Sequence, residues 1–122
     1  MSNTPDAGFA LIEAGQASSE VTFSETIIRL QARLSGAISQ TNTPPGSPTV
    51  GDVYVCGTAP TGLWDGQANK ITIWYGGSWR FVPDVTSDGS DIPMGARQEG
   101  WLMYFQSTNA LMVFNGTAWA AV

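Results

Sequence analysis

A helical period runs through residues 22–38. Thr22 and Glu25 have the spacing of a capping box, in which a hydroxyl and a carboxylate satisfy backbone N–H groups at a helix start. A proline-rich stretch, 41–50, follows and cannot continue a helix. The pattern predicts a helix over 22–38, inside a heptad segment 18–40. Its apolar residues are spaced by four, three, four and three, as in a coiled-coil seam: Phe23, Ile27, Leu30, Leu34 and Ala37.

Two interpretations of this seam remain open. The seam could pack on the chain's own sheet, or identical helices could meet around a symmetry axis. Two heptads are too short for a free-standing coiled coil, because short helices are marginal in isolation. The proline-rich break behind the helix favours the second interpretation, in which the five seam residues form an oligomer contact.

From residue 51 onward the apolar residues recur with a period of two, which indicates strands. In GDVYVCG (51–57), Val53 and Val55 share one face and Tyr54 the other. A hairpin is predicted over 70–82, with a tight turn at Gly76-Gly77. Its strands place Thr72, Trp74, Trp79 and Phe81 on one face, and Ile71, Ile73, Tyr75, Arg80 and Val82 on the other.

This hairpin occurs twice. ITIWYGGSWRFV (71–82) aligns without a gap with LMVFNGTAWAAV (111–122), and the strand opening at Gly51 matches the one opening at Gly100. Asn115-Gly116 predicts a type I′ turn in the second copy. We therefore expect a β domain over 51–122 with two repeated units, 51–83 and 100–122. The expected fold is mainly β with one N-terminal helix, a small antiparallel meander or sandwich.

The N-terminal residues 1–17 carry no clear period and are expected to be irregular. They lack the basic region and long apolar run of a signal peptide. No apolar run in the chain approaches the roughly 18 residues of a membrane span. We expect synthesis in a cytoplasm without membrane insertion.

Composition points to protein partners. Charged residues make up 12% of the chain, against about 25% in a typical soluble domain. A surface so poor in charge is typical of proteins that keep much of it in protein–protein contact. The net charge of −5 and the scattered basic residues argue against nucleic-acid binding, which needs clustered Lys and Arg.

The chain lacks the residues of common catalytic and metal sites. It has no histidine and one cysteine, so the usual general base, the commonest zinc ligand and an internal disulfide are excluded. The acidic loop 84–91 lacks the spacing of a calcium loop. Nothing places Asp52 and Asp65 as a catalytic carboxylate pair. We expect no enzyme activity, metal or cofactor.

The five tryptophans allow two roles. Trp79 and Trp119 are equivalent in the repeat and are expected to be structural anchors. Trp64 and Tyr75 lie in or beside Gly-rich loops and are candidate receptor or glycan contacts, since exposed rings stack on sugars. A binding module would cluster exposed aromatics at the end distal to the helix. A structural protein would bury its tryptophans or use them against neighbouring chains.

The ordered set of motifs over 11–122 resembles a family of phage tail-fibre domains found in prophages, free phages and gene-transfer agents. In this sequence the resemblance lies in a PP-x-x-P-x-x-G-D-x-Y-V opening, T-G-x-W-x-G, I-x-x-W-x-x-G-x-W-x-F-x-P, a later G-W and a terminal F-x-G-x-x-W. The residues are Pro44, Pro45, Pro48, Gly51, Asp52, Tyr54, Val55, Thr61, Gly62, Trp64, Gly66, Ile71, Trp74, Gly77, Trp79, Phe81, Pro83, Gly100, Trp101, Phe114, Gly116 and Trp119.

The resemblance implies a virion protein of a bacteriophage tail or fibre. Such proteins are commonly homotrimers that dock on the particle through an N-terminal segment, here 1–17, and point their β part outward. The alternative is a receptor- or glycan-binding module acting in host attachment. This chain departs from the pattern at Ser24, where the family has Asn, and in an insertion over 84–96.

Overall fold

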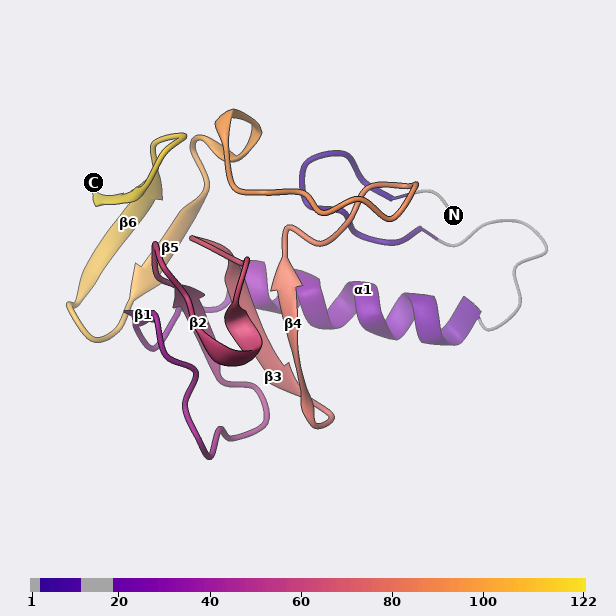
Figure 1. Cartoon of the computed structure of the whole chain (residues 1–122), viewed down its shortest axis with the longest axis horizontal. Helices are drawn as coiled ribbons and strands as arrows, with labels where there is room; N and C mark the ends of the chain where they lie inside the picture. The colour runs from indigo at the N-terminus through magenta and orange to yellow at the C-terminus, as the bar shows by residue number, and fades with distance from the viewer. Residues whose placement is uncertain (1–2, 12–18) are drawn as a thin grey trace.

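The computed structural model of the chain describes residues 3–11 and 19–122 (Figure 1). These residues form one α-helix and two β-sheets, so the expectation of a mainly-β fold with one helix is confirmed. The elements are α1 (Ser19–Leu34), β1 (Gln40–Thr41), β2 (Val53–Cys56), the 3₁₀ turn η1 (Gly62–Trp64), β3 (Ile71–Tyr75), β4 (Ser78–Val82), the 3₁₀ turn η2 (Ala96–Gln98), β5 (Leu102–Phe105), β6 (Ala110–Phe114) and β7 (Trp119–Ala121).

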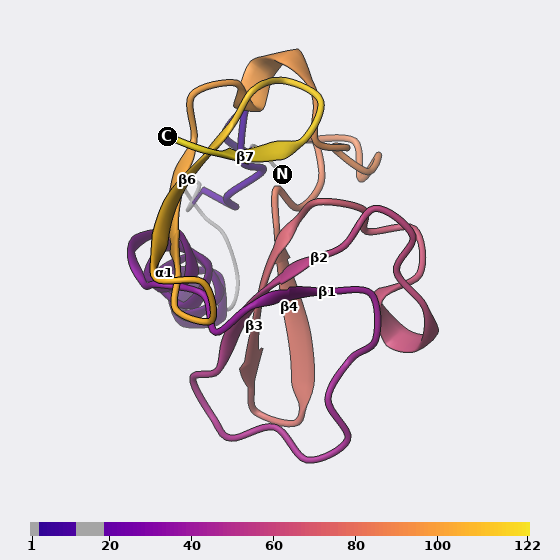
Figure 2. The same cartoon turned by 90° about the vertical axis from the view of Figure 1, so that its left-hand side faces the viewer.

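The first sheet has the order β1-β2-β3-β4 and the second the order β5-β6-β7. Figure 2 shows α1 and the second sheet along one side of the molecule, with the first sheet along the other. All strand pairs are antiparallel except β1 with β2, which is parallel. The two-residue strand β1 was not predicted, because it is too short to carry a period.

The two sheets repeat one three-stranded meander, β2-β3-β4 and β5-β6-β7. The amide of Gly51 donates to the Trp74 carbonyl at 2.8 Å, and the amide of Gly100 donates to the Phe114 carbonyl at 2.8 Å. These two glycines have φ of 94° and 95°, a conformation that favours glycine. The repeat therefore extends to equivalent backbone hydrogen bonds.

The two hairpin turns differ. Tyr75 pairs with Ser78 across Gly76-Gly77, and both glycines have positive φ, as a type I′ turn requires. The prediction of the same turn at Asn115-Gly116 is wrong. That loop has four residues, because the Asn115 side chain accepts hydrogen bonds from the amides of residues 117 and 118, both at 2.9 Å.

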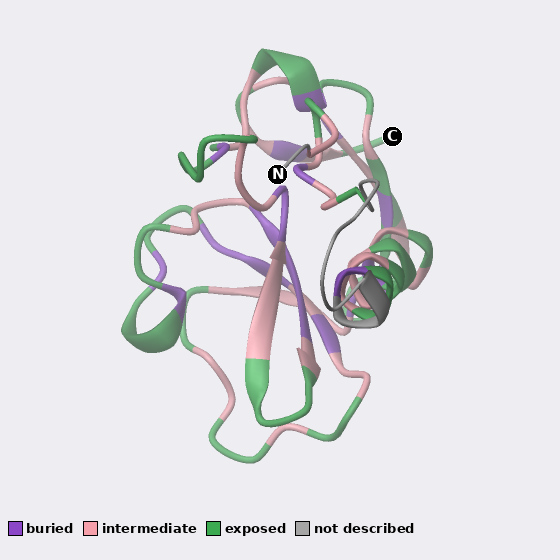
Figure 3. Cartoon of the chain, turned by 90° about the vertical axis from the view of Figure 1, so that its right-hand side faces the viewer, coloured by how far each residue is buried: buried purple, intermediate pink, exposed green. Residues whose placement is uncertain are grey.

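The predicted faces of the first hairpin are confirmed by the strand register and by burial. The aliphatic face of the first sheet is buried, and it forms the core together with one face of the second sheet. Figure 3 shows the buried stretches of β2 and β3 in the interior. The core residues of the two sheets are Val53, Val55, Ile71, Ile73, Val82, Met103, Phe105, Phe114 and Trp119.

The helix begins and ends earlier than predicted. Thr22 is the fourth residue of α1, so it is not the N-cap, and the capping box predicted at 22–25 is wrong. α1 ends at Leu34, and the chain then becomes extended. The backbone of Ala37 pairs with β5, donating to the Tyr104 carbonyl at 2.8 Å and accepting from the Gln106 amide at 2.9 Å.

Residues 3–11 fold back on the chain's own insertion. The amide of Asp84 donates to the Ala7 carbonyl at 2.8 Å, and the Asn3 side chain donates to the Val85 carbonyl at 2.9 Å. Gly8 lies against Val85, where a Cβ would come within 2.6 Å of the carbonyl oxygen. Residues 1–2 and 12–17, the rest of the expected attachment segment, lie outside the described residues, as does residue 18. Within the described parts, no helix has the length and apolar character needed to cross a membrane.

Candidate assembly surface

Four of the five predicted seam residues form an exposed stripe along α1. Their exposed fractions are 57% for Phe23, 44% for Ile27, 40% for Leu30 and 79% for Leu34. We call these four residues the α1 stripe. The fifth, Ala37, is fully buried and lies beyond the helix end. Its assignment to the seam was wrong, because the backbone pairing with β5 buries it inside the subunit.

The stripe does not pack on the chain's own sheet. α1 contacts β3 and β4 through a different face, which carries the fully buried Ala32 and the partly buried Ile28 and Arg29. With about 100° of turn per residue, this face and the stripe lie on roughly opposite sides of the helix. The interpretation in which the seam covers the chain's own sheet is therefore wrong.

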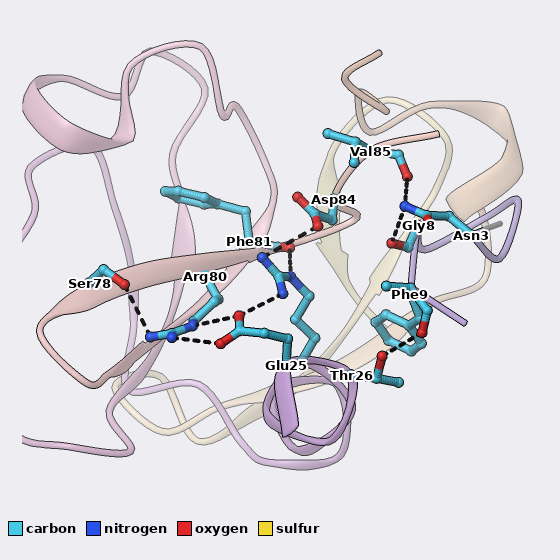
Figure 4. Close-up of polar contacts among 12 residues, drawn as sticks. Asn3, Gly8, Phe9, Glu25, Thr26, Ser78, Arg80, Phe81, Asp84 and Val85 are labelled. Carbon is cyan, nitrogen blue, oxygen red and sulfur yellow. Dashed lines mark hydrogen bonds and ion pairs between the residues drawn. The ribbon is translucent and has the colours of Figure 1, made fainter. Parts of the chain in front are cut away.

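A half-buried ion-pair network holds α1 in this orientation (Figure 4). Arg80 on β4 donates to the two carboxylate oxygens of Glu25 at 3.0 and 2.8 Å. Arg29 donates to Glu25 at 3.1 Å and pairs with Asp84 at 3.3 Å. Turning the stripe inward would separate Arg80 from Glu25 and Arg29 from Asp84. That would leave partly buried charges without these partners, which is costly.

The pKa values of the two carboxyl groups in this network are shifted in opposite directions. The hydrogen bond from Arg80 lowers the pKa of Glu25 below its ordinary value of 4.5, although burial opposes the shift. Burial raises the pKa of Asp84 above 3.8, and the nearby Arg29 offsets only part of that rise. The ionised form of Glu25 is thus stabilised by folding, whereas that of Asp84 is disfavoured.

Shallow hollows flank the stripe on both sides. One of about 430 Å³ lies between its C-terminal half and the N-terminal segment, with Trp101 in its wall. Arg33 lies over the Trp101 ring, 4.3 Å from the ring centre. Another, of about 420 Å³, lies between the N-terminal half of the stripe and the β3–β4 turn. The stripe is therefore a ridge between two grooves.

Trp64 is not available to a ligand. It is fully buried, so its assignment as a receptor or glycan contact was wrong. Its ring packs against Tyr54 and edge-on against Trp79, with ring centres 5.8 and 5.2 Å apart. The sequence placed Trp64 in a Gly-rich loop, and only the fold shows that this loop turns inward over the outer face of the first sheet.

Tyr75 is 45% exposed, but it lies beside the helix and not at the distal end. It lines the hollow that also contains Phe23 and Ile27. The Arg80 guanidinium is 5.9 Å from its ring centre, and one Arg80 nitrogen donates to the Tyr75 carbonyl. Tyr75 therefore belongs to the border of the stripe.

The two predicted anchors both pack on aromatic neighbours. Trp79 contacts Trp74 as well as Trp64. Trp119 is 7% exposed and packs on Phe105 and Phe114. Its Nε1 donates to the Asn69 carbonyl at 2.8 Å, which ties the second sheet to the loop before β3.

Sequence reasoning missed the residues that orient the helix. Arg80 was placed on the aliphatic face of the hairpin, and a charged residue on an otherwise apolar face is a signal that a partner is required. The partner, Glu25, could not be identified without the fold. Across the described residues, no three His, Cys, Asp or Glu side chains are grouped so that they could hold a metal ion.

Comparison with known proteins gives one match. The family model described as Protein of unknown function (DUF2793) matches residues 23–120, from the first residue of the α1 stripe to β7. No curated protein and no solved structure matches the chain.

Proposed function

The chain belongs to the family described as Protein of unknown function (DUF2793), and we propose that it is a structural protein of a bacteriophage tail or fibre that assembles as a homotrimer. The α1 stripe carries this proposal. Four large apolar side chains at heptad spacing, all at least 40% exposed, are rarely left in water on an isolated domain. Identical stripes turned toward a common axis would cover one another.

The free energy of burying the stripe supports a role for it in association. The exposed parts of its four side chains are together equivalent to about two fully exposed side chains. Burying them contributes roughly 3–6 kcal/mol per copy. Association costs at least about 4 kcal/mol in lost translational and rotational freedom. Two stripes in contact would contribute roughly 6–12 kcal/mol, which lies within the range of about 4–15 kcal/mol for that cost. The stripe is therefore large enough to matter but gives no clear surplus by itself. Three copies around one axis would share the contact.

The trimeric state and the virion location rest on the resemblance to phage tail-fibre domains. The low fraction of charged residues, 12%, supports a protein that keeps much of its surface in contact with other proteins. α1 packs beside β3 and β4 of the β domain, so the outward-pointing β part of a fibre is taken from the resemblance alone.

The positions of the tryptophans favour a structural protein over a receptor- or glycan-binding module. All five lie in the described residues, and each is buried or half-buried. Of the two candidate contacts, Trp64 is buried and Tyr75 lies beside the helix. A cluster of exposed aromatic rings at the end distal to α1, which the binding hypothesis requires, is not found in the described part of the chain.

The solution mass of the full chain tests the proposal. Light scattering should give three times the chain mass of 12.9 kDa. Ile27→Glu should shift this mass toward the monomer, because it places a charge inside the seam. Leu63→Glu is the matched control, since Leu63 is also an exposed apolar residue, at 76%, but lies in η1 away from the helix.

A monomer mass for the wild-type chain up to high micromolar concentration would refute the trimer. So would an Ile27→Glu variant that keeps the wild-type mass. Equal loss of mass in Ile27→Glu and Leu63→Glu would indicate a general effect of added charge and would also count against the stripe.

Attachment to the rest of the particle through residues 1–17 is part of the proposal. Residues 3–11 fold on the chain's own insertion, so an attachment would use the exposed edge of this segment, where Pro5 lies. Pro5→Glu should lower the amount of the protein in purified particles without changing its solution mass. Unchanged incorporation would argue against this site.

A further inference from the structure

The two repeated units turn opposite faces of their sheets toward the core. Hydrogen bonds and strand register make Val53 and Val55 equivalent to Leu102 and Tyr104. In the first sheet this aliphatic face is inside the subunit, with Val53 3% and Val55 0% exposed. In the second sheet the equivalent residues are 48% and 43% exposed.

The same inversion holds on the neighbouring strands. Ile71 is fully buried, whereas its equivalent, Leu111, is 44% exposed. Val82 is fully buried, whereas its equivalent, Val122, is 78% exposed and donates its amide to the Leu111 carbonyl at 3.1 Å. We call the set Leu102, Tyr104, Leu111, Val113 and Val122 the outer face of the second sheet.

The inversion follows from how the sheets are stacked. The aliphatic face of the first sheet packs against α1 and against the aromatic face of the second sheet, which carries Phe114 and Trp119. The opposite face of the first sheet lies under the loop that carries Trp64. The outer face of the second sheet has no such cover from the described residues, although its pattern matches a face that is buried in the first repeat.

The outer face and the α1 stripe lie on the same side of the molecule. Figure 2 shows α1 and β6 along one edge of the molecule, and Figure 1 shows β6 beyond the C-terminal end of the helix. Arg33, next to the last stripe residue, reaches the Leu102 carbonyl at 3.5 Å. An axis that runs along the stripe therefore continues past the outer face.

The exposed area argues for one combined contact. Stable interfaces bury about 800 Å² on each partner. The stripe and the outer face each expose the equivalent of about two whole side chains, roughly 300–500 Å² each at about 150–250 Å² for a large side chain. Neither surface alone reaches the usual size, whereas the two together come close to it.

We infer that the outer face of the second sheet packs against a second copy of this chain, as the continuation of the α1 stripe in one interface. The inference rests on the proposed homo-oligomer and adds the β domain to its contact. β5, β6 and β7 contain no charged residue, so the contact leaves no ionised group of these strands without a partner. The second repeat would thus be the assembly module of the β domain.

Leu111→Glu tests the inference in the full-length chain. Leu111 is exposed in the subunit, so the change should leave the fold intact, as near-ultraviolet circular dichroism from Trp119 can check. We expect the dissociation constant of the oligomer, measured by sedimentation, to rise at least about tenfold. Leu111→Ser, which removes apolar surface without adding charge, is the second variant, and Leu63→Glu is the matched control.

Three outcomes separate this inference from the proposed function. Loss of affinity in both Leu111 variants but not in Leu63→Glu supports the inference. If Ile27→Glu dissociates the oligomer while both Leu111 variants keep the wild-type dissociation constant, the inference is overturned and the proposed function stands. If the wild-type chain is monomeric throughout, a second copy does not cover the outer face, and both proposals fail.

Discussion

At the scale of single residues, an ion-pair network contributes to the orientation of the helix. Glu25 receives hydrogen bonds from both Arg80 and Arg29, and all three side chains are at least two-thirds buried. Ala32 and Ile28 pack in the core on the same face of the helix, and the Thr26 hydroxyl donates to the Ala10 carbonyl at 2.6 Å. The Glu25 carboxylate therefore acts together with these contacts in setting which face of α1 is turned outward.

We predict that Glu25→Gln lowers the free energy of unfolding by about 1–3 kcal/mol at neutral pH, since two partly buried arginines lose their charged partner. The folded-state pKa of Glu25 is lowered, so its stabilisation is present above the unfolded value and is lost as pH falls through the folded value. Urea unfolding at neutral and acidic pH should show a deficit that shrinks in acid. Glu99→Gln, at an exposed carboxyl, is the control, and an equal deficit at both pH values would contradict the prediction.

We also predict that Cys56 reacts with thiol reagents only when the protein unfolds. The side chain is fully buried, and burial raises the pKa of the thiol to about 12. The thiolate, which is the reactive form, is therefore scarce at mildly alkaline pH. Labelling followed by mass spectrometry across a denaturant series should follow the unfolding transition. Labelling of the native protein as fast as a free thiol would disprove this.

At the scale of elements, the N-terminal segment behaves as part of the domain. Its carbonyls and amides pair with the insertion 84–96, and Asp6 binds Arg97 and the Gln98 side chain. The insertion, which departs from the tail-fibre pattern, is thus the surface on which residues 3–11 fold. The N-terminal segment lines the hollow beside the α1 stripe, and together with the insertion it lines a separate hollow.

Gly8→Ala should release this segment. Gly8 has φ of 70°, and an added Cβ would lie 2.6 and 2.7 Å from backbone atoms of Val85, which cannot move as a side chain could. The amide of Asp84, bonded to Ala7, should lose protection from hydrogen exchange measured by NMR, while the β2–β3 amides keep theirs. Gly46→Ala, where nothing lies within 4 Å, is the control. Unchanged protection of Asp84 in Gly8→Ala would show that the segment tolerates the clash.

At the scale of the whole molecule, three charged residues of the helix are only partly exposed, whereas two groups of large apolar side chains are exposed. Glu25, Arg29 and Arg33 are only partly exposed, whereas the α1 stripe and the outer face of the second sheet are free of charge. An assembly through such surfaces is governed by apolar burial and not by charge steering.

The oligomer should therefore be insensitive to salt. We expect its dissociation constant to change by less than about threefold between low salt and molar sodium chloride, because screening acts on exposed charges and not on apolar burial. Sedimentation at a series of salt concentrations measures this. Dissociation in high salt would indicate a charged interface elsewhere on the surface and would contradict the assembly proposed above.

Much of the secondary structure could be predicted because it depends on the pattern of neighbouring residues along the chain. The helix, the strands of both repeats and the faces of the first hairpin follow from periods of 3.5 and two residues. The predictions were wrong where contacts with other side chains or with distant parts of the chain determine the conformation or the burial of a residue. The Asn115 side chain accepts a hydrogen bond within its own loop, which has four residues. The backbone of Ala37 pairs with β5, and Trp64 is buried in the loop that covers the first sheet.

The sequence by itself determined which residues share a face, because the spacing of side chains along a helix or strand is fixed by backbone geometry. It could not determine which of those faces is buried. The aliphatic face is covered in the first repeat and open in the second, although their patterns agree. Only the tertiary structure decided this, because burial depends on what packs against a face, and the residues that cover it come from distant parts of the chain.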